Sequence, residues 1–249
     1  MARLVLVHGA FGGAWVWEPV LDALRAAGHS PETIDLPGAG EDQTPLEDVT
    51  LAAYGERICR TLAEGEPAVL VGQSMGGLAV TQAAAQCPDA VSSLVYASAF
   101  APLEGQSLMD LVAYPEAADD QVQAHMVVEG DPPVARLPPE AAINAIFNRT
   151  SPEHARRAAE RLGAQPLRPF ADPLTVPDEN RAAFEALPRA YIVCVHDRAI
   201  APPMQRRMLA DVGCEPVVEL EADHAPWMSQ RDAFVGALDR IARSLVEPR

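Results

Sequence analysis

Apolar residues along the chain fall into two kinds of pattern. Short runs rich in Val, Ile and Leu predict buried strands at residues 4–7, 32–36, 68–71, 93–97, 191–195 and 217–220. Longer segments with apolar positions three or four residues apart predict helices at residues 17–27, 51–63, 78–86, 204–211 and 231–245. Strands and helices alternate along the chain. This alternation is typical of an α/β fold with a mostly parallel sheet flanked by helices on both faces.

The alternation stops between the fourth and fifth predicted strands. Twelve of the 23 prolines lie between Pro102 and Pro188, and proline at this density excludes long helices and central strands. We expect short helices and loops there, forming a cap over one edge of the sheet. An irregular flank with no role in binding is the alternative. The predicted domains are a core of residues 1–101 and 187–249 and an inserted cap of residues 102–186.

Composition excludes several classes of function. The 249 residues are 49% hydrophobic and 22% charged, which is typical of a packed globular protein. The net charge of −16 disfavours binding to nucleic acid or to an anionic membrane surface. All 19 basic residues are Arg. Without a lysine, Schiff-base chemistry, pyridoxal phosphate anchoring and a P-loop are all excluded.

The cysteines and the first residues bear on the cellular compartment. The four cysteines form no Cys-x-x-Cys pair, so we expect reduced, mostly buried thiols rather than disulfides or a zinc site. The first apolar run is too short for a signal peptide, and no run approaches the roughly 20 apolar residues of a membrane span. We therefore expect a cytoplasmic protein.

The strongest local signal is the motif Gly-Gln-Ser-Met-Gly at residues 72–76. It follows a predicted strand and precedes a predicted helix, which is the context that a nucleophile elbow requires. Glycines on both sides of Ser74 suit a sharp turn where neighbouring chains approach closely. We therefore expect Ser74 to be a catalytic nucleophile.

A serine nucleophile needs a base, usually a histidine. Of the six histidines, His224 directly follows the last predicted strand, and loops after parallel strands gather at the edge where Ser74 is expected. We expect His8 to shape the loop after the first strand rather than to abstract a proton. His29, His125 and His154 are expected to be structural or solvated, and His196 is set aside because it precedes the adjacent candidate acid Asp197 in a tight loop. We predict that His224 is the base.

The carboxylate that orients the base should lie between the serine and the histidine in the chain, the order of α/β-hydrolases. Asp197 directly follows the strand at 191–195 and fits this order. Asp223 is the rival, but a sequence neighbour rarely directs its carboxylate at the adjacent ring. Asp211 lies within a predicted helix. Asp197 is therefore the predicted acid.

An oxyanion hole needs two amide donors, each typically worth about 3 kcal/mol or more in the transition state. We expect these amides to belong to Met75 and to Ala10, in the Gly-rich loop after the first strand. That loop lacks the glycine spacing of a phosphate-binding turn. Phe11, Trp15 and Trp227 flank these loops and are candidates for lining a substrate pocket, although core packing explains them equally well. No metal or organic cofactor is expected, because no three well-spaced ligands are visible.

Together these motifs resemble the α/β-hydrolase superfamily, and most closely its branch of plant methylesterases, hydroxynitrile lyases and related bacterial esterases. The resemblance covers the core, roughly residues 3–100 and 189–245, and rests on the elbow and on residues 4–17, 35–38, 191–194 and 223–226. It implies the triad Ser74, Asp197 and His224, with the oxyanion amides of Ala10 and Met75.

Three positions depart from that branch. Its hydroxynitrile lyases have a lysine after the catalytic histidine and a threonine after the first-strand histidine, where this chain has Ala225 and Gly9. Cyanohydrin cleavage is therefore disfavoured. Relatives commonly have histidine before the nucleophile, where this chain has Gln73.

We therefore expect a serine hydrolase that cleaves a carboxylic ester, or a lactone or thioester, of a small, largely apolar substrate. Two alternatives stay open. One is a non-hydrolytic lyase or cyclase acting as a tailoring enzyme on the same scaffold, and the other is a small-molecule receptor with weak hydrolase activity. The expected partner is a small ester-like molecule. The sequence does not distinguish a monomer from a homodimer formed through the cap.

Overall fold

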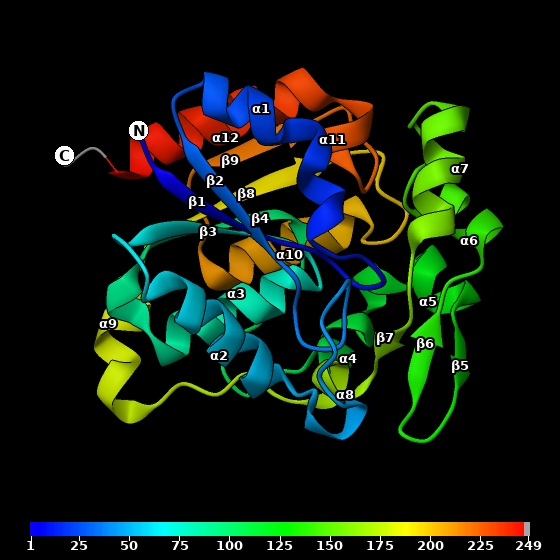
Figure 1. The fold of residues 1–249 in the computed structure, drawn as a ribbon, viewed down its shortest axis with the longest axis horizontal. Coiled ribbons are helices and arrows are strands. Elements are labelled where there is room, and N and C mark those ends of the chain that lie inside the picture. Colours follow the sequence, from blue (N-terminus) through cyan, green and yellow to red (C-terminus); the bar gives the residue numbers. More distant parts are fainter. Residues whose placement is uncertain (247–249) are drawn as a thin grey trace.

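Six parallel strands form the central sheet in a computed structural model that describes residues 1–246 (Figure 1). Their order across the sheet is β2-β1-β3-β4-β8-β9. The strands are β1 Arg3–Val7, β2 Ser30–Ile34, β3 Ala68–Ser74, β4 Val91–Ala99, β8 Arg189–Cys194 and β9 Val217–Leu220. Every predicted strand is present within three residues of its expected bounds, so the predicted α/β fold is confirmed.

Helices cover both faces of this sheet (Figure 1). On one face lie α1 Glu18–Ala26, α11 Pro226–Ser229 and α12 Arg231–Val246, and on the other α2 Leu51–Leu62, α3 Gly76–Gln86 and α10 Pro202–Val212. Side chains of one strand alternate between the two cores: Val5 and Val7 pack with α2 and α3, whereas Leu4 and Leu6 pack with α1 and α12. The continuous apolar runs of the sequence reflect this burial on both faces.

The inserted segment, residues 102–186, joins β4 to β8. Its helices are α4 Leu108–Val112, α5 Gln121–His125, α6 Pro139–Ala145, α7 Pro152–Arg161, α8 Arg168–Ala171 and α9 Arg181–Ala186. It also contains a small antiparallel sheet of β5 Val127–Glu129, β6 Val134–Arg136 and β7 Gln165–Pro166. Short helices were expected, but the small sheet was not, because strands of two or three residues are too short to show an alternating pattern.

A disulfide joins Cys59 of α2 to Cys87 at the end of α3, with the two Cα atoms 6.1 Å apart. The prediction of reduced thiols is therefore wrong for this pair, whereas Cys194 and Cys214 are free and buried as expected. The pairing arises because α2 and α3 pack side by side on the sheet, which brings together two cysteines separated by 28 positions in the sequence. Since disulfides persist mainly in oxidising compartments, the cysteines no longer support a cytoplasmic location.

The topology brings the loops that follow all six parallel strands to one edge of the sheet. The chain passes outward from β1 to β2 and then returns to build β3, β4, β8 and β9 on the other side of β1. In such sheets ligands bind outside the carboxyl ends of the strands, near the point where the order reverses. Ser74, Asp197 and His224 follow or end three of these strands.

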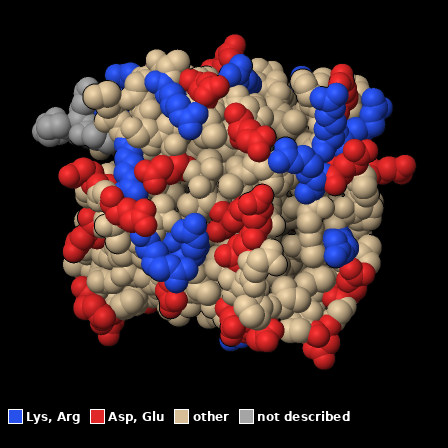
Figure 2. Space-filling view, viewed as in Figure 1, with Lys and Arg blue, Asp and Glu red and all other residues tan. Residues whose placement is uncertain are grey.

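Acidic side chains are spread over the surface with arginines between them (Figure 2). Many arginines pair with an acid, for example Arg206 with Glu219 at 2.7 Å and Arg161 with Glu18 at 3.4 Å. Within residues 1–246, no helix is both long and apolar enough to cross a membrane.

Candidate active site

Ser74 stands at a sharp turn from β3 into α3. Its φ of +55° lies in the left-handed region, which residues with a side chain rarely adopt. The turn has no space for side chains at the flanking glycines. A Cβ on Gly72 would lie 2.6 Å from the carbonyl oxygen of Gly76, and a Cβ on Gly76 would lie 2.6 Å from that of His8. The motif thus forms the strand–turn–helix bend that a nucleophile elbow requires.

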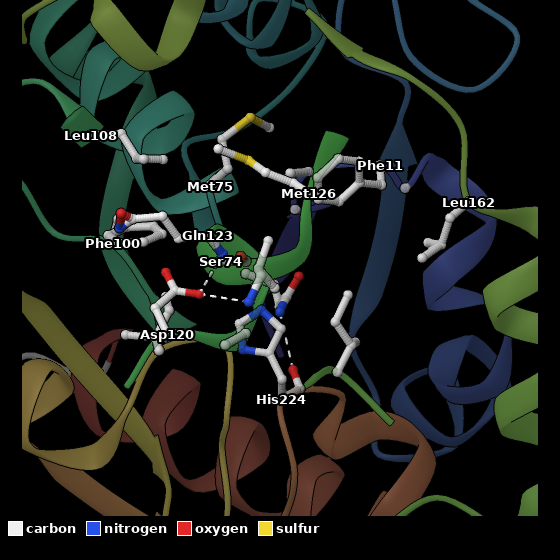
Figure 3. Close-up of a pocket in the computed structure, with 18 of the residues that line it drawn as sticks. Phe11, Ser74, Met75, Phe100, Leu108, Asp120, Gln123, Met126, Leu162 and His224 are labelled. Carbon is white, nitrogen blue, oxygen red and sulfur yellow. Dashed lines mark hydrogen bonds between the residues drawn. The ribbon is translucent and has the colours of Figure 1, made fainter. Parts of the chain in front are cut away.

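His224 and Asp197 form a buried pair on the loops after β9 and β8. Nδ1 of His224 lies 2.7 Å from Oδ2 of Asp197, and both residues are less than 5% exposed. With Nδ1 directed at the carboxylate, Nε2 is the ring nitrogen that remains for chemistry. His224 and Ser74 line the same cavity (Figure 3).

The carboxylate controls the protonation of this ring. Burial alone would lower the pKa of His224, but the charge and hydrogen bond of Asp197 outweigh it and raise the pKa above the ordinary value for histidine. Because Asp197 accepts from Nδ1–H, the neutral ring keeps its proton there and presents Nε2 as an acceptor.

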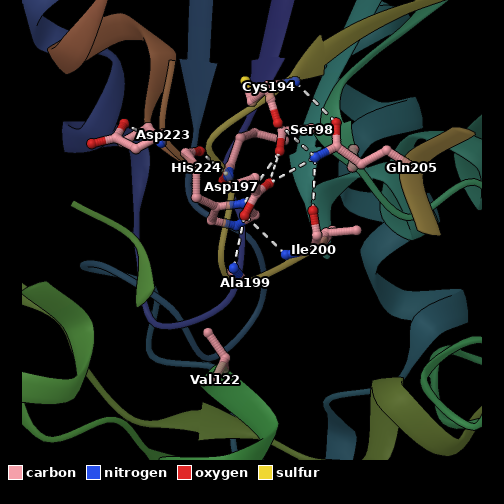
Figure 4. Close-up of polar contacts among 12 residues, drawn as sticks. Ser98, Val122, Cys194, Asp197, Ala199, Ile200, Gln205, Asp223 and His224 are labelled. Atoms are coloured by element: carbon pink, nitrogen blue, oxygen red, sulfur yellow. Dashed lines mark hydrogen bonds and ion pairs between the residues drawn. The ribbon is translucent and has the colours of Figure 1, made fainter. Parts of the chain in front are cut away.

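Asp197 is itself held by four further donors (Figure 4). Its Oδ1 accepts from the backbone N–H groups of Ala199 at 2.7 Å and Ile200 at 2.9 Å. Its Oδ2 accepts from Nε2 of Gln205 at 3.1 Å and from the hydroxyl of Ser98. These bonds offset the cost of burying a carboxylate and fix its orientation toward the ring.

Sequence reasoning missed Ser98 and Gln205. Ser98 lies near the carboxyl end of β4, the strand beside the nucleophile strand, and its φ of +48° turns its side chain toward Asp197. Gln205 is fully buried on α10 between the buried Met204 and Met208. The sequence did contain one signal for Gln205: it is a polar residue on the apolar face of the helix that follows the predicted acid.

Gln73, which stands where relatives commonly have histidine, connects the elbow to the histidine loop. It is 4% exposed, and its Nε2 donates to the carbonyl oxygen of His224 at 3.0 Å. The side chain therefore positions the loop that carries the imidazole.

Asp223, the rival acid, bonds away from the ring of His224 (Figure 4). Its Oδ2 accepts from the N–H of Arg149 at 2.9 Å and the hydroxyl of Thr150 at 3.0 Å. Its Oδ1 accepts from the N–H of Ala225 at 3.1 Å and the hydroxyl of Ser229 at 2.7 Å. Asp223 thus joins the loop after β9 to the inserted segment, while Asp197 accepts the hydrogen bond from the imidazole of His224.

Two other histidines have structural partners. His8 is fully buried, which lowers its pKa. Its Nε2 accepts from the N–H of Leu36 at 3.1 Å, so its Nδ1 donates to the carbonyl oxygen of Gly9 at 2.8 Å. His196 pairs at the surface with Glu221. No group of three or more His, Cys, Asp or Glu residues is placed to hold a metal ion anywhere in the described chain.

The predicted oxyanion donors lie in the two loops that border Ser74. Ala10 and Met75 both line the cavity, and neither backbone N–H has an acceptor among residues 1–246. The loop that carries Ala10 bends at Phe11, whose φ is +65°. The carbonyl oxygen of Phe11 accepts from the N–H of Gly163 at 2.8 Å, which attaches this loop to the inserted segment.

The cavity over Ser74 has a volume of about 170 Å³ and mostly apolar walls (Figure 3). Phe11 and Trp227 line it, whereas the ring of Trp15 lies outside against Arg161, whose guanidinium carbon is 4.2 Å from the ring centroid. Among the described residues that line the cavity, Asp120 alone has a carboxylate. The inserted segment contributes much of the wall, including Leu108, Val122, Met126, Phe147, Leu162 and Phe170.

Known proteins share this sequence pattern. A family model described as the alpha/beta hydrolase family matches residues 4–237. Methylesterase 2 of Arabidopsis thaliana is 30% identical over 242 residues, which cover 90% of this chain and 89% of that protein. Putative methylesterase 11, chloroplastic, of Arabidopsis thaliana is 28% identical over 252 residues. That match covers 97% of this chain but only 64% of the relative's length.

The fold is shared as well. The crystal structure of polyneuridine aldehyde esterase superposes with a TM-score of 0.86 at 27% identity, covering 97% of this chain and 99% of that one. The resemblance inferred from the motifs, to α/β-hydrolases of the plant methylesterase branch, is confirmed. Because the family model extends from β1 into α12, the chain belongs to the α/β hydrolase family.

Proposed function

We propose that the protein is a serine hydrolase that cleaves carboxylic esters of small, largely apolar acids through an acyl-enzyme on Ser74. One observation carries the proposal: the imidazole that Asp197 holds at 2.7 Å borders the same cavity as Ser74. Relatives named as methylesterases and an esterase support ester hydrolysis as the reaction. Lactones and thioesters present the same carbonyl chemistry.

In the first half of the reaction, Oγ of Ser74 attacks the ester carbonyl while Nε2 of His224 takes its proton. The carbonyl oxygen becomes an oxyanion that accepts from the N–H groups of Ala10 and Met75, each worth about 3 kcal/mol in reactions of this kind. His224 then protonates the leaving alcohol as its bond to the acyl carbon breaks. Asp197 stabilises the transient imidazolium.

The second half repeats this chemistry with water. Nε2 of His224 takes a proton from a water molecule whose oxygen attacks the acyl carbon. The tetrahedral intermediate uses the same two amides. Its collapse breaks the bond to Ser74, whose oxygen recovers a proton from His224, and the carboxylic acid leaves.

The size and lining of the cavity support a small substrate. Its volume of about 170 Å³ is below the roughly 300–1,000 Å³ typical of sites for drug-sized ligands. We propose that the inserted segment acts as a cap here, because it supplies much of the apolar wall of the cavity and excludes water from the acyl-enzyme.

Hydrolysis of para-nitrophenyl acetate and butyrate, together with a simple methyl ester, tests the proposal. Ser74→Ala should lower kcat/KM by at least about a thousandfold, because the remaining groups cannot form an acyl-enzyme. Ser244→Ala, at an exposed serine of α12, is the matched control and should retain full activity. A wild-type rate no higher than that of Ser74→Ala, measured on folded protein, contradicts the proposal.

A further inference from the structure

A single carboxylate enters the mostly apolar cavity above Ser74. Asp120 belongs to the inserted segment, is 9% exposed, and lies on the same side of the cavity as the ring of His224 (Figure 3). Its Oδ1 accepts from the backbone N–H groups of Val122 at 2.8 Å and Gln123 at 2.9 Å. No donor among the described residues reaches its Oδ2, so this oxygen is left for whatever occupies the cavity.

Helix capping does not require a charge at this position. Asp120 caps α5, a helix of five residues. Elsewhere the chain caps helices with a neutral hydroxyl, by Thr50 at α2 and Ser107 at α4. Burying a carboxylate that has one unpaired oxygen costs free energy that a serine or asparagine cap would avoid. The charge therefore needs an explanation beyond the fold.

The position of Asp120 is fixed relative to the reacting groups. The N–H of Gln121 donates to the carbonyl oxygen of Arg198 at 2.9 Å, next to Asp197 in the loop after β8. This bond holds the start of α5 against the loop that orients His224. A ligand group on Oδ2 would therefore lie close to the ester carbonyl at Ser74.

Although burial disfavours its charge, this carboxyl is ionised at neutral pH. Burial raises the pKa of Asp120 to about 6, against the lowering effects of the two amides and of His224, while Asp197 adds to the rise. Asp119 and Arg198 line a separate surface hollow. Above pH 6 the free oxygen is thus a charged hydrogen-bond acceptor in a cavity with few other polar groups.

We propose that Asp120 selects esters that carry a hydrogen-bond donor, a hydroxyl or amino group, a few bonds from the ester carbonyl. This inference rests on the proposed esterase function and names its substrate class. A substrate donor would satisfy Oδ2 and gain a charge-assisted hydrogen bond in a water-poor site. An ester with a second carboxylate would instead meet a like charge and should be the poorest substrate.

Methyl esters of one skeleton test the proposal: methyl 3-phenylpropanoate, methyl 3-phenyllactate, phenylalanine methyl ester and benzylmalonic acid monomethyl ester. They differ only in the substituent beside the ester carbonyl, which is hydrogen, hydroxyl, amino or carboxylate. Methyl 3-(4-hydroxyphenyl)propanoate places the donor at the far end instead. For the wild-type protein, kcat/KM with a hydroxyl or amino substituent should exceed that of the unsubstituted ester by about tenfold.

Asp120→Asn is the informative variant, because asparagine also caps helices but places an amide donor where the free oxygen was. Relative to the unsubstituted ester, it should abolish the preference for donors and improve the carboxylate ester. Asp120→Ser removes the carboxylate while keeping a capping hydroxyl and should also abolish the preference. Asp119→Asn, which removes the same charge from the exposed neighbouring residue, should keep it.

The outcomes separate this inference from the proposed function. Equal kcat/KM for all substituents, or a donor preference that survives in Asp120→Asn and Asp120→Ser, overturns the role of Asp120 and leaves the esterase function standing. If the wild-type protein does not hydrolyse the unsubstituted ester, or if Ser74→Ala hydrolyses it at the same rate, the esterase function is overturned and this inference with it.

Discussion

The substitution Asp223→Asn separates the two aspartates that compete in the sequence for the role of catalytic acid. Asp223 is fully buried and accepts four hydrogen bonds, none of them from the ring of His224. We expect the change to destabilise the protein while leaving its chemistry nearly intact.

The size of the stability loss follows from the four donors that bond to Asp223. An amide keeps one accepting oxygen, so two donors that met a carboxylate oxygen would meet an NH₂ group. The hydroxyls of Thr150 and Ser229 can rotate to accept from it, but the backbone N–H of Arg149 or Ala225 cannot. One lost charge-assisted bond and the weakening of the others should cost about 2–3 kcal/mol. For a chain of this length, Tm should fall by about 4–12 °C.

The assay measures both properties for matched variants. Thermal unfolding gives Tm for Asp223→Asn and Asp197→Asn, and ester hydrolysis gives kcat below the unfolding range. Asp223→Asn should keep kcat within about tenfold of the wild type, since it does not alter the hydrogen bond at Nδ1 of His224. An unchanged Tm with a thousandfold loss of kcat would refute this reasoning and make Asp223 the acid.

Four other predictions concern the His224–Asp197 pair, the disulfide and Asp120. Asp197→Asn should lower kcat by a factor of about 10³–10⁴, because His224 would adopt the wrong tautomer. In the wild type, kcat/KM should rise with pH, because only the neutral ring acts as a base. The midpoint of this rise should lie above the ordinary pKa of histidine, and a midpoint below it would contradict the raised pKa of His224. Reducing the Cys59–Cys87 bond, whose cysteines are 28 positions apart, should destabilise the protein by about 3–4 kcal/mol. Reductant should therefore lower the Tm of the wild type, and Cys59→Ser should have the same lower Tm without reductant. The preference for donor-bearing esters should fall below pH 6 as Asp120, with a pKa of about 6, becomes protonated; the ratio of two kcat/KM values cancels the common titration of His224, and a flat ratio would refute the assignment.

The sequence predicted the elements that are buried on both sides. Strands such as β3 and β8 are continuous apolar runs because helices cover both faces of the sheet. The placement of Ser74, Asp197 and His224 followed from the same rule, since loops after parallel strands converge on one edge. Each of these inferences needed only local pattern and strand order.

Features that depend on packing between distant segments could not be predicted. The Cys59–Cys87 bond requires the angle at which α2 and α3 meet, and spacing along the chain does not encode it. Trp15 follows Phe11 closely in sequence, yet its ring lies outside the cavity against Arg161. Asp120 lies in a proline-rich segment without periodicity, so its direction depends on how short helices fold over the sheet.

The hydrogen bonds between the inserted segment and the core have a kinetic consequence. The segment is attached to the loops around the site at separate points, through Asp223, through the N–H of Gln121 and through the carbonyl of Phe11. Hinged opening would break all of these contacts in every turnover. Met109, about half exposed at the rim, has an unbranched and flexible side chain. Rotamer changes of such an exposed side chain take picoseconds to nanoseconds, whereas hinge motions take microseconds to milliseconds.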